Sequence, residues 1–128
     1  MAITGKTILL VEDEPALLEA VKLKFDKEGV GTYTAVTGEQ ALEVLKKVTP
    51  TLVWLDILLP RMNGLEVLKN MREDPKLKDQ PVIVVSVSAG PEKIKQAFGL
   101  SVLDYLIKSE YTIDEIVKKT IGLLAKIP

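Results

Sequence analysis

The chain has 128 residues, of which 47% are hydrophobic, and this length suits one compact domain with one core. Its 17 basic and 18 acidic residues give a net charge of −1, so the composition lacks the basic excess that nucleic-acid-binding proteins usually show. Histidine and cysteine are both absent, which excludes imidazole catalysis, a phosphohistidine, thiolate metal sites and disulfides.

The first half of the chain alternates short apolar runs with helical patterns. Residues 7–11 are almost continuously apolar and predict a first strand that is buried on both faces. Pro15 suits the first turn of a helix, which two glycines would end. A short second strand over 33–36 is followed by a helix that Thr37 and Gln40 would begin as a capping box.

The second half continues the same alternation. Three further strands are predicted over residues 51–55, 82–87 and 103–107. The helices that separate and follow them should begin after Asn63, at Pro91 and, through a second capping box, at Thr112 and Glu115. The helix from Pro91 carries Ile94 and Phe98 as its apolar residues. Five strands and five helices in strict alternation predict an α/β fold around a parallel sheet.

Polar side chains stand at or near the end of four predicted strands. Glu12 and Asp13 follow the first strand, Asp56 the third and Lys108 the fifth, while Ser86 stands near the end of the fourth. In open α/β sheets, ligands bind at the carboxyl ends of the strands near the point where the strand order reverses. We therefore expect these side chains to converge in one crevice.

The chemistry of these residues matches phosphoryl transfer. Three carboxylates in one crevice repel each other, and a hard divalent cation such as Mg²⁺ supplies the missing counter-charge. A carboxylate can act as a nucleophile and form an aspartyl-phosphate. The phosphoryl oxygens then need neutralisation, which Mg²⁺, a lysine ammonium and a hydroxyl donor would provide.

Four stretches resemble the receiver domains of bacterial and archaeal response regulators, and the resemblance covers nearly the whole chain. They are ILLVEDEP (8–15), LVWLDILLPRMNG (52–64), PVIVVSVSA (81–89) and DYLIKS (104–109). The resemblance implies a flavodoxin-like, doubly wound sheet of five parallel strands in the order 2-1-3-4-5, with five helices. It also implies a signalling switch rather than an enzyme with an external substrate. A partner histidine kinase or phosphotransfer protein would donate the phosphoryl group, and an unidentified protein would be the target.

The resemblance gives a role to each acidic residue of the crevice. Glu12 and Asp13 are similar to the Mg²⁺-binding acids of the family. Asp56 corresponds to the phosphoacceptor, which also binds the metal, and the backbone carbonyl of Leu58 corresponds to a further metal ligand. The implied cofactor is Mg²⁺.

The resemblance also assigns the residues that would sense the phosphoryl group. Ser86 corresponds to the switch hydroxyl, Tyr105 to the switch aromatic and Lys108 to the phosphate-pairing lysine. Three positions depart from the family pattern: Ser109 replaces a proline, Val87 a small residue, and Ser101-Val102 a Gly-Ala pair. Without a proline, the peptide bond between Lys108 and Ser109 should be trans, because a cis bond there costs about 2.5–4 kcal/mol.

Two other functions fit part of this pattern. A degenerate receiver would be a constitutive protein-binding module, but the intact acids, Ser86 and Lys108 argue against it. A hydrolase of the haloacid dehalogenase kind would need an Asp-x-Asp site, but Leu58 stands two positions after Asp56.

We therefore expect one receiver domain over 1–128 without an output domain. We expect it in the cytoplasm, as a monomer or weak phosphorylation-dependent dimer, with no direct contact to nucleic acid or membrane.

Overall fold

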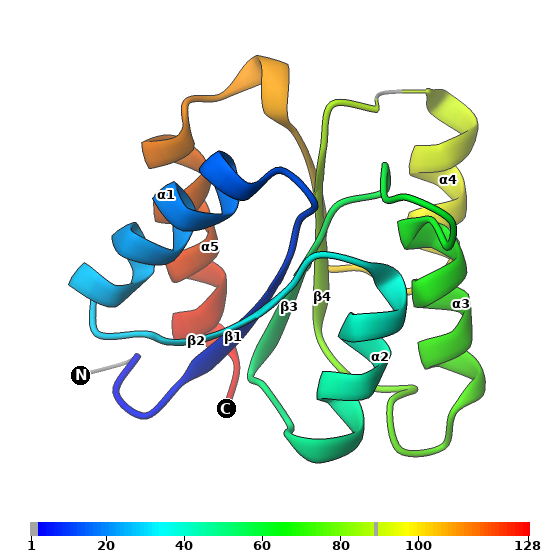
Figure 1. Cartoon of the computed structure of the whole chain (residues 1–128), viewed down its shortest axis with the longest axis horizontal. Helices are drawn as coiled ribbons and strands as arrows, with labels where there is room; N and C mark the ends of the chain where they lie inside the picture. Colours follow the sequence, from blue (N-terminus) through cyan, green and yellow to red (C-terminus); the bar gives the residue numbers. More distant parts are fainter. Residues whose placement is uncertain (1–2, 89) are drawn as a thin grey trace.

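Five parallel strands form one sheet in the order β2-β1-β3-β4-β5. The computed structural model describes residues 3–88 and 90–128 (Figure 1). The strands are β1 (Thr7–Val11), β2 (Gly31–Ala35), β3 (Leu52–Leu55), β4 (Val82–Ser86) and β5 (Asp104–Ile107). The helices are α1 (Pro15–Lys27), α2 (Gly38–Lys47), α3 (Gly64–Glu73), α4 (Pro91–Gly99) and α5 (Ile113–Lys126), with a 3₁₀ turn η1 (Lys108–Glu110). The predicted fold and strand order are confirmed, and within the described residues no helix has the length and apolar character needed to span a membrane.

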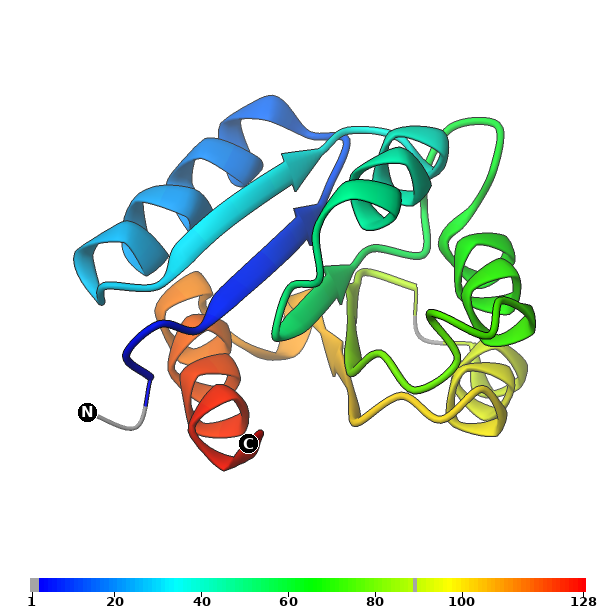
Figure 2. The same ribbon diagram turned by 90° about the horizontal axis from the view of Figure 1, so that it is seen from below.

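The sheet separates two layers of helices, with α1 and α5 on one face and α2, α3 and α4 on the other (Figures 1 and 2). Successive residues of a strand point to opposite faces, so each strand supplies both layers. In β1, Ile8 and Leu10 pack with the α1–α5 layer, whereas Leu9 and Val11 pack with the other layer. Burial on both faces explains why the central strands are continuously apolar.

Side-chain caps begin three of the helices. Asn63 and Thr112 each form a complete capping box, as expected for Thr112 with Glu115. The predicted box at α2 is only half correct. The Thr37 side chain accepts a hydrogen bond from the backbone N–H of Gln40 at 3.0 Å, but the Gln40 side chain accepts from Val36 at 2.9 Å. Because β2 ends at Ala35, the N–H of Val36 has no partner in the sheet ladder and takes this oxygen.

The start of the second strand differs from the sequence expectation. The second strand begins at Gly31 instead of residue 33, because Gly31 pairs with Thr7 rather than forming a turn. A Cβ atom on Gly31 would lie 3.1 Å from the Thr7 side chain, so the pairing favours glycine. Phe98 is 49% exposed, because the neighbouring Ala97 takes the buried position on α4. The other strand boundaries agree with the prediction or differ by one residue, which is the usual uncertainty of element ends.

At the end of the sheet opposite the candidate site, the Arg72 side chain near the C-terminus of α3 binds four backbone carbonyl groups. Its guanidinium donates hydrogen bonds to Leu77 at 3.0 Å, Lys78 at 3.1 Å and Gln80 at 3.0 Å in the loop before β4. It also donates to Leu100, the residue that ends α4, at 2.7 Å. One side chain therefore fixes the loop before β4 and the end of α4 relative to α3.

Candidate functional site

Lys108 joins two buried carboxylates at the carboxyl end of the sheet. Its Nζ atom lies 2.6 Å from Oε1 of Glu12 and 2.9 Å from Oδ2 of Asp56. Glu12 is 2% exposed and Asp56 4%, whereas Asp13 is exposed to solvent. One carboxylate oxygen from each of the three acids lies within 4.8 Å of the others. The predicted convergence of these four side chains is therefore confirmed.

The alternation of side chains along the strands explains why three of these residues meet. Glu12, Asp56 and Lys108 immediately follow β1, β3 and β5. Two positions before them stand Leu10, Trp54 and Leu106, which all pack in the α1–α5 layer. The three polar residues thus continue the rows that face this layer. Because β4 lies between β3 and β5, only a long side chain such as lysine reaches the carboxylates from β5.

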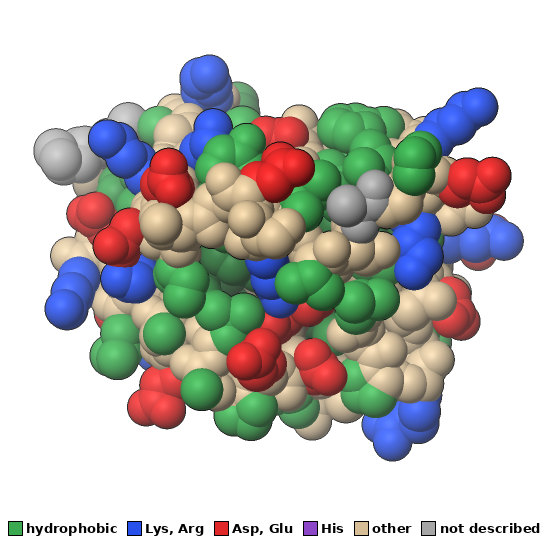
Figure 3. Space-filling view, turned by 90° about the horizontal axis from the view of Figure 1, so that it is seen from above, with side chains coloured by type: hydrophobic (Ala, Val, Ile, Leu, Met, Phe, Trp, Pro, Cys, Tyr) green, Lys and Arg blue, Asp and Glu red, His purple; other side chains and the backbone are tan. Residues whose placement is uncertain are grey.

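Figure 3 shows the face at which the strands end. Acidic side chains gather near its middle around a basic side chain, and hydrophobic side chains border them. Leu58 and Val87 contribute exposed apolar side chains in the loops that follow β3 and β4. The entrance to the acidic cluster is therefore partly apolar.

The N-terminus of α3 packs directly against the backbone of Asp56. The Asp56 Oδ1 atom accepts a hydrogen bond from the N–H of Leu58 at 3.0 Å, and the N–H of Gly64 donates to the carbonyl of Ile57 at 2.8 Å. A Cβ atom on Gly64 would lie 2.2 Å from the Asp56 carbonyl oxygen, which is far below a normal contact. Only glycine allows this approach, so α3 positions the acidic residue.

We expect Gly64→Ala to lower the free energy of unfolding by about 2 kcal/mol, because the backbone around Asp56 must move to admit the methyl group. Chemical denaturation measures this change. The control is Gly122→Ala in α5, whose Cβ would meet no atom within 4 Å. That variant should gain about 0.5–1 kcal/mol from helix propensity. Equal stabilities of the two variants would contradict the close approach at Gly64.

The protonation of the three contacting groups follows from burial and proximity. Burial, followed by the neighbouring Asp56 carboxylate, raises the pKa of Glu12 to about 8. Burial also raises the pKa of Asp56, but its contacts with Glu12 and Lys108 outweigh this and leave its pKa below the usual value. Burial lowers the pKa of Lys108, and its bonds to both carboxylates more than reverse this. These opposite shifts make Glu12 the more readily protonated of the two acids and favour an ionised Asp56 opposite the Lys108 ammonium.

The three acids fit a hard divalent cation. The Oε2 atom of Glu12 is buried and has no hydrogen-bond partner among the described residues. A cation near the Asp13 and Asp56 oxygens would satisfy it. Mg²⁺ prefers oxygen ligands from few carboxylates and keeps several waters, and the exposed Asp13 leaves one side of the cluster open to solvent.

Ser86 and Tyr105 both hold the loop after β4. The Ser86 side chain is fully buried, and its Oγ accepts a hydrogen bond from the N–H of Ser88 at 3.2 Å. The Tyr105 hydroxyl donates to the carbonyl of Ser88 at 2.6 Å. Among the described residues, no hydrogen bond joins either side chain to Asp56 or Lys108. The switch roles of Ser86 and Tyr105, and the metal-ligand role of the Leu58 carbonyl, stay predictions.

The chain after Lys108 forms the η1 turn, which the sequence did not predict. The described residues contain no cis peptide bond, so the bond between Lys108 and Ser109 is trans, as expected without proline. The turn leads to Thr112, which caps α5. Lys108 therefore reaches the carboxylates from the first residue of a 3₁₀ turn.

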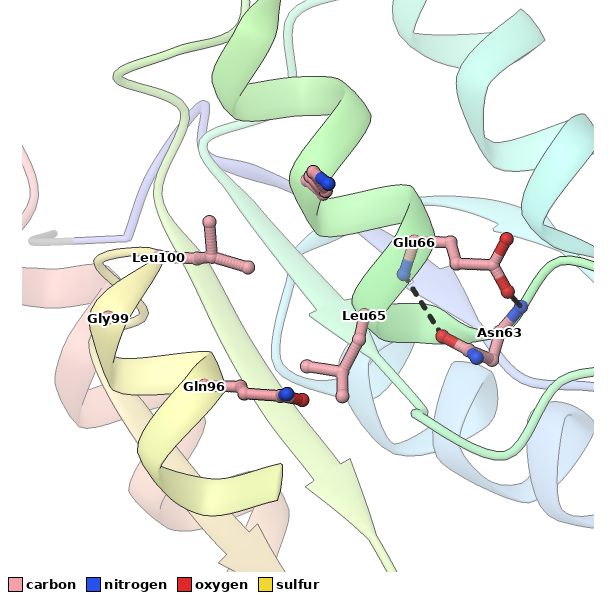
Figure 4. A pocket seen from close by; sticks show the side chains of 7 residues that line it. Asn63, Leu65, Glu66, Gln96, Gly99 and Leu100 are labelled. Atoms are coloured by element: carbon pink, nitrogen blue, oxygen red, sulfur yellow. Dashed lines mark hydrogen bonds between the residues drawn. The ribbon is translucent and has the colours of Figure 1, made fainter. Parts of the chain in front are cut away.

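A hollow of about 540 Å³ lies apart from the carboxylates, between α3 and α4 (Figure 4). Leu65, Gln96 and Leu100 line it, and the capping box of Asn63 and Glu66 stands at its edge. None of the four converging residues lines this hollow. The chemistry expected from the sequence therefore belongs to the acidic cluster alone.

A sequence model of the family described as response regulator receiver domain matches residues 8–121. The chain belongs to this family. Sporulation initiation phosphotransferase F of Bacillus subtilis is 36% identical over 124 residues, covering 93% of this chain and 96% of that protein. The regulator of RpoS of Escherichia coli K12 is 39% identical over 106 residues, covering 83% of this chain. The receiver spans about a third of that protein's length, 31%.

Solved structures of receivers share the fold over almost the whole chain. The Mn²⁺-bound form of response regulator Rcp1 matches with a TM-score of 0.84 and 28% identity, covering 96% of both chains. The phosphorylated cyanobacterial phytochrome response regulator RcpA matches with a TM-score of 0.81 and 29% identity, covering 92% of this chain and 90% of that chain. Receiver domains are signalling modules of two-component systems and take phosphoryl groups from histidine kinases or phosphotransfer proteins.

Proposed function

We propose that this receiver accepts a phosphoryl group on Asp56, with Mg²⁺ held by Glu12, Asp13 and Asp56, and thereby switches a protein-binding surface. The observation that carries the proposal is the double contact of Lys108 with two buried carboxylates. Burial of charged groups costs several kcal/mol of desolvation, so such a cluster is poor at stabilising a fold and points to a functional role. These 128 residues contain no histidine, so the donor is a histidine outside them, on a histidine kinase or phosphotransfer protein.

Leu58, Asp56 and Lys108 each have a defined part in the transfer. The N–H of Leu58 holds Oδ1 of Asp56, so Oδ2 is the attacking oxygen, and the Lys108 ammonium moves from Oδ2 to the phosphoryl oxygens. A bond forms between Oδ2 and phosphorus while the bond from phosphorus to the donor atom breaks, and the donor leaves with the electron pair. The Lys108 ammonium neutralises charge on the transferred oxygens. Bound Mg²⁺ supplies further neutralisation.

The proposal is tested by mixing the protein with Mg²⁺ and acetyl phosphate. We expect a mass gain of one phosphoryl group on the peptide that contains Asp56, stable in acid and labile in base. A degenerate receiver would gain no mass. A hydrolase would release phosphate continuously without accumulating the modified form. Detection of the phosphoryl group on another residue would overturn the assignment.

Mg²⁺ affinity should depend on pH through Glu12. Because burial raises the pKa of this carboxyl to about 8, Mg²⁺ must displace a proton at lower pH. The apparent affinity should rise by about tenfold per pH unit below this pKa and level off above it. Calorimetric titration with Mg²⁺ between pH 6 and 9 measures the effect. Glu12→Gln should bind more weakly with little pH dependence, and a flat profile for the parent protein would contradict the raised pKa.

The phosphoryl group should last longer than in receivers with a polar residue at position 58. Hydrolysis needs a water in line with the phosphorus–oxygen bond, and polar side chains help to place it. Leu58 offers no hydrogen bond, and Val87 adds apolar bulk on the same face. Leu58→Asn should therefore shorten the lifetime severalfold, measured as decay of the phosphorylated protein in Mg²⁺ buffer. An unchanged or slower decay would show that Leu58 does not exclude the water.

A further inference from the structure

A second hollow lies between α1 and α5, and the Lys108 side chain forms part of its wall. Its volume is about 160 Å³. The buried walls come from Trp54 of β3, Val85 of β4 and Ile116 of α5. The half-buried side chains of Leu17, Tyr111 and Ile113 complete it on the solvent side. Five segments of the chain thus border one small, mainly apolar space beside the acidic cluster, and this space is partly open to solvent.

Most side chains in the wall of this cavity offer water no hydrogen bond. A buried water needs two to four polar partners. Three side chains in the wall carry polar groups, namely Trp54, Lys108 and Tyr111. The Lys108 ammonium already contacts Glu12 and Asp56. An apolar cavity of about 150 Å³ in a protein core stays dry and takes up benzene or xenon, so a space of this size and lining suits an apolar guest.

We propose that this cavity is a binding site for small apolar molecules about the size of one aromatic ring, and that a bound molecule holds Lys108 against Glu12 and Asp56. The aromatic rings of Trp54 and Tyr111 in the wall offer the contacts that aromatic guests favour. A guest packed against the aliphatic part of Lys108 restricts the movement of its ammonium group. The ligand thereby favours the state in which Lys108 occupies the carboxylates.

The coupling to phosphorylation rests on the proposed function, whereas binding to the cavity does not. Lys108 contacts the same Glu12 and Asp56 carboxylates that would hold Mg²⁺. A ligand that fixes Lys108 there opposes the entry of the cation, because two positive charges then compete for one pair of acids. By reciprocity, Mg²⁺ lowers the affinity of the ligand by the same factor.

Binding is tested with benzene as the probe, in the absence of Mg²⁺. Trp54 is the only tryptophan and lines the cavity, so its emission reports occupancy directly. The parent protein should show a saturable change in emission and a higher melting temperature with benzene. Leu17→Phe fills the cavity and should abolish both effects. Leu23→Phe places the same side chain on an exposed position of α1 and should leave both unchanged.

Two results would overturn the binding site. One is the absence of a saturable response in the parent protein, and the other is an equal response in Leu17→Phe. If Leu17→Phe does not fold, Val85→Ile replaces it, since one added methylene reduces the cavity and should weaken benzene binding severalfold while preserving the fold.

The coupling is tested with acetyl phosphate at subsaturating Mg²⁺. Saturating benzene should slow phosphorylation of the parent by about fivefold, at the lower end of allosteric couplings, and excess Mg²⁺ should restore the rate. Leu17→Phe should be phosphorylated at one rate with or without benzene. An unchanged rate in the parent would overturn the coupling. If the parent accepts no phosphoryl group even without benzene, the proposed function fails, and the Trp54 measurement still decides the cavity.

Discussion

Asp56→Asn should abolish phosphorylation by acetyl phosphate and should leave the receiver folded. The amide cannot attack phosphorus, so the nucleophile is lost outright. The fold survives because Lys108 keeps its contact with Glu12, whose Oε1 atom lies 2.6 Å from Nζ. Without the Asp56 charge, Glu12 ionises more readily and forms the remaining ion pair with Lys108. The buried cluster therefore stays electrically balanced.

The measurement is the mass of the intact protein after incubation with Mg²⁺ and acetyl phosphate, with circular dichroism as the test of folding. Asp26→Asn is the matched control, because this carboxylate is exposed near the C-terminus of α1 and distant from the acidic cluster. It should be phosphorylated as completely as the parent. If Asp56→Asn still gains a phosphoryl group, for example on Asp13, then Asp56 is not the acceptor.

Arg72→Ala should lower the free energy of unfolding by about 4 kcal/mol, because four backbone carbonyls lose a charged donor at once. The loss is large because these carbonyls belong to two segments, the loop before β4 and the end of α4, that meet only part of their hydrogen-bond needs elsewhere. Urea denaturation of the purified protein measures it. The proposed phosphorylation site lies at the other end of the strands, so phosphoryl uptake by the folded variant should be unchanged.

Two control variants separate hydrogen bonding from charge and side-chain length. Arg72→Lys keeps the charge but has one ammonium group in place of the planar fork, so it should recover only a minor part of the lost stability. Arg61→Ala removes an exposed guanidinium whose contact with Glu39 spans 3.5 Å, and it should cost less than about 1 kcal/mol. Equal losses at positions 61 and 72 would contradict the role assigned to the Arg72 bonds.

Most of the fold could be predicted because the central strands are apolar on both faces. The strand Thr7–Val11 was recognisable because its residues are almost continuously apolar, and the structure has the same boundaries. The edge strand β2 was harder, because its residues are mostly exposed and its first residue, Gly31, also reads as a turn. The exposure of Phe98 could not be predicted from the sequence either. On a short helix, a small residue such as Ala97 can take the buried position and leave the aromatic ring outside.

The acidic cluster was predictable because side chains alternate between the two faces along each strand and the parallel strands all end at one edge of the sheet. The sequence could not show that Lys108 contacts Glu12 as well as Asp56, since that depends on a side chain crossing β4. Nor could it show that Ser86 and Tyr105 both hold Ser88, because the loop after β4 has no regular pattern. Gly64 was visible in the sequence. The reason for a glycine there follows only from the short distance between its Cβ position and the Asp56 carbonyl oxygen.

The sheet divides the hydrophobic core into two groups of side chains that have no member in common. Substitutions in the α1–α5 layer and in the α2–α4 layer are separated by the backbone of the sheet, so their effects on stability should add with little interaction energy. Sequence change can therefore proceed in one layer without compensation in the other. The exceptions are residues at the carboxyl edge, where Lys108, Glu12 and Asp56 touch across three strands and must change together.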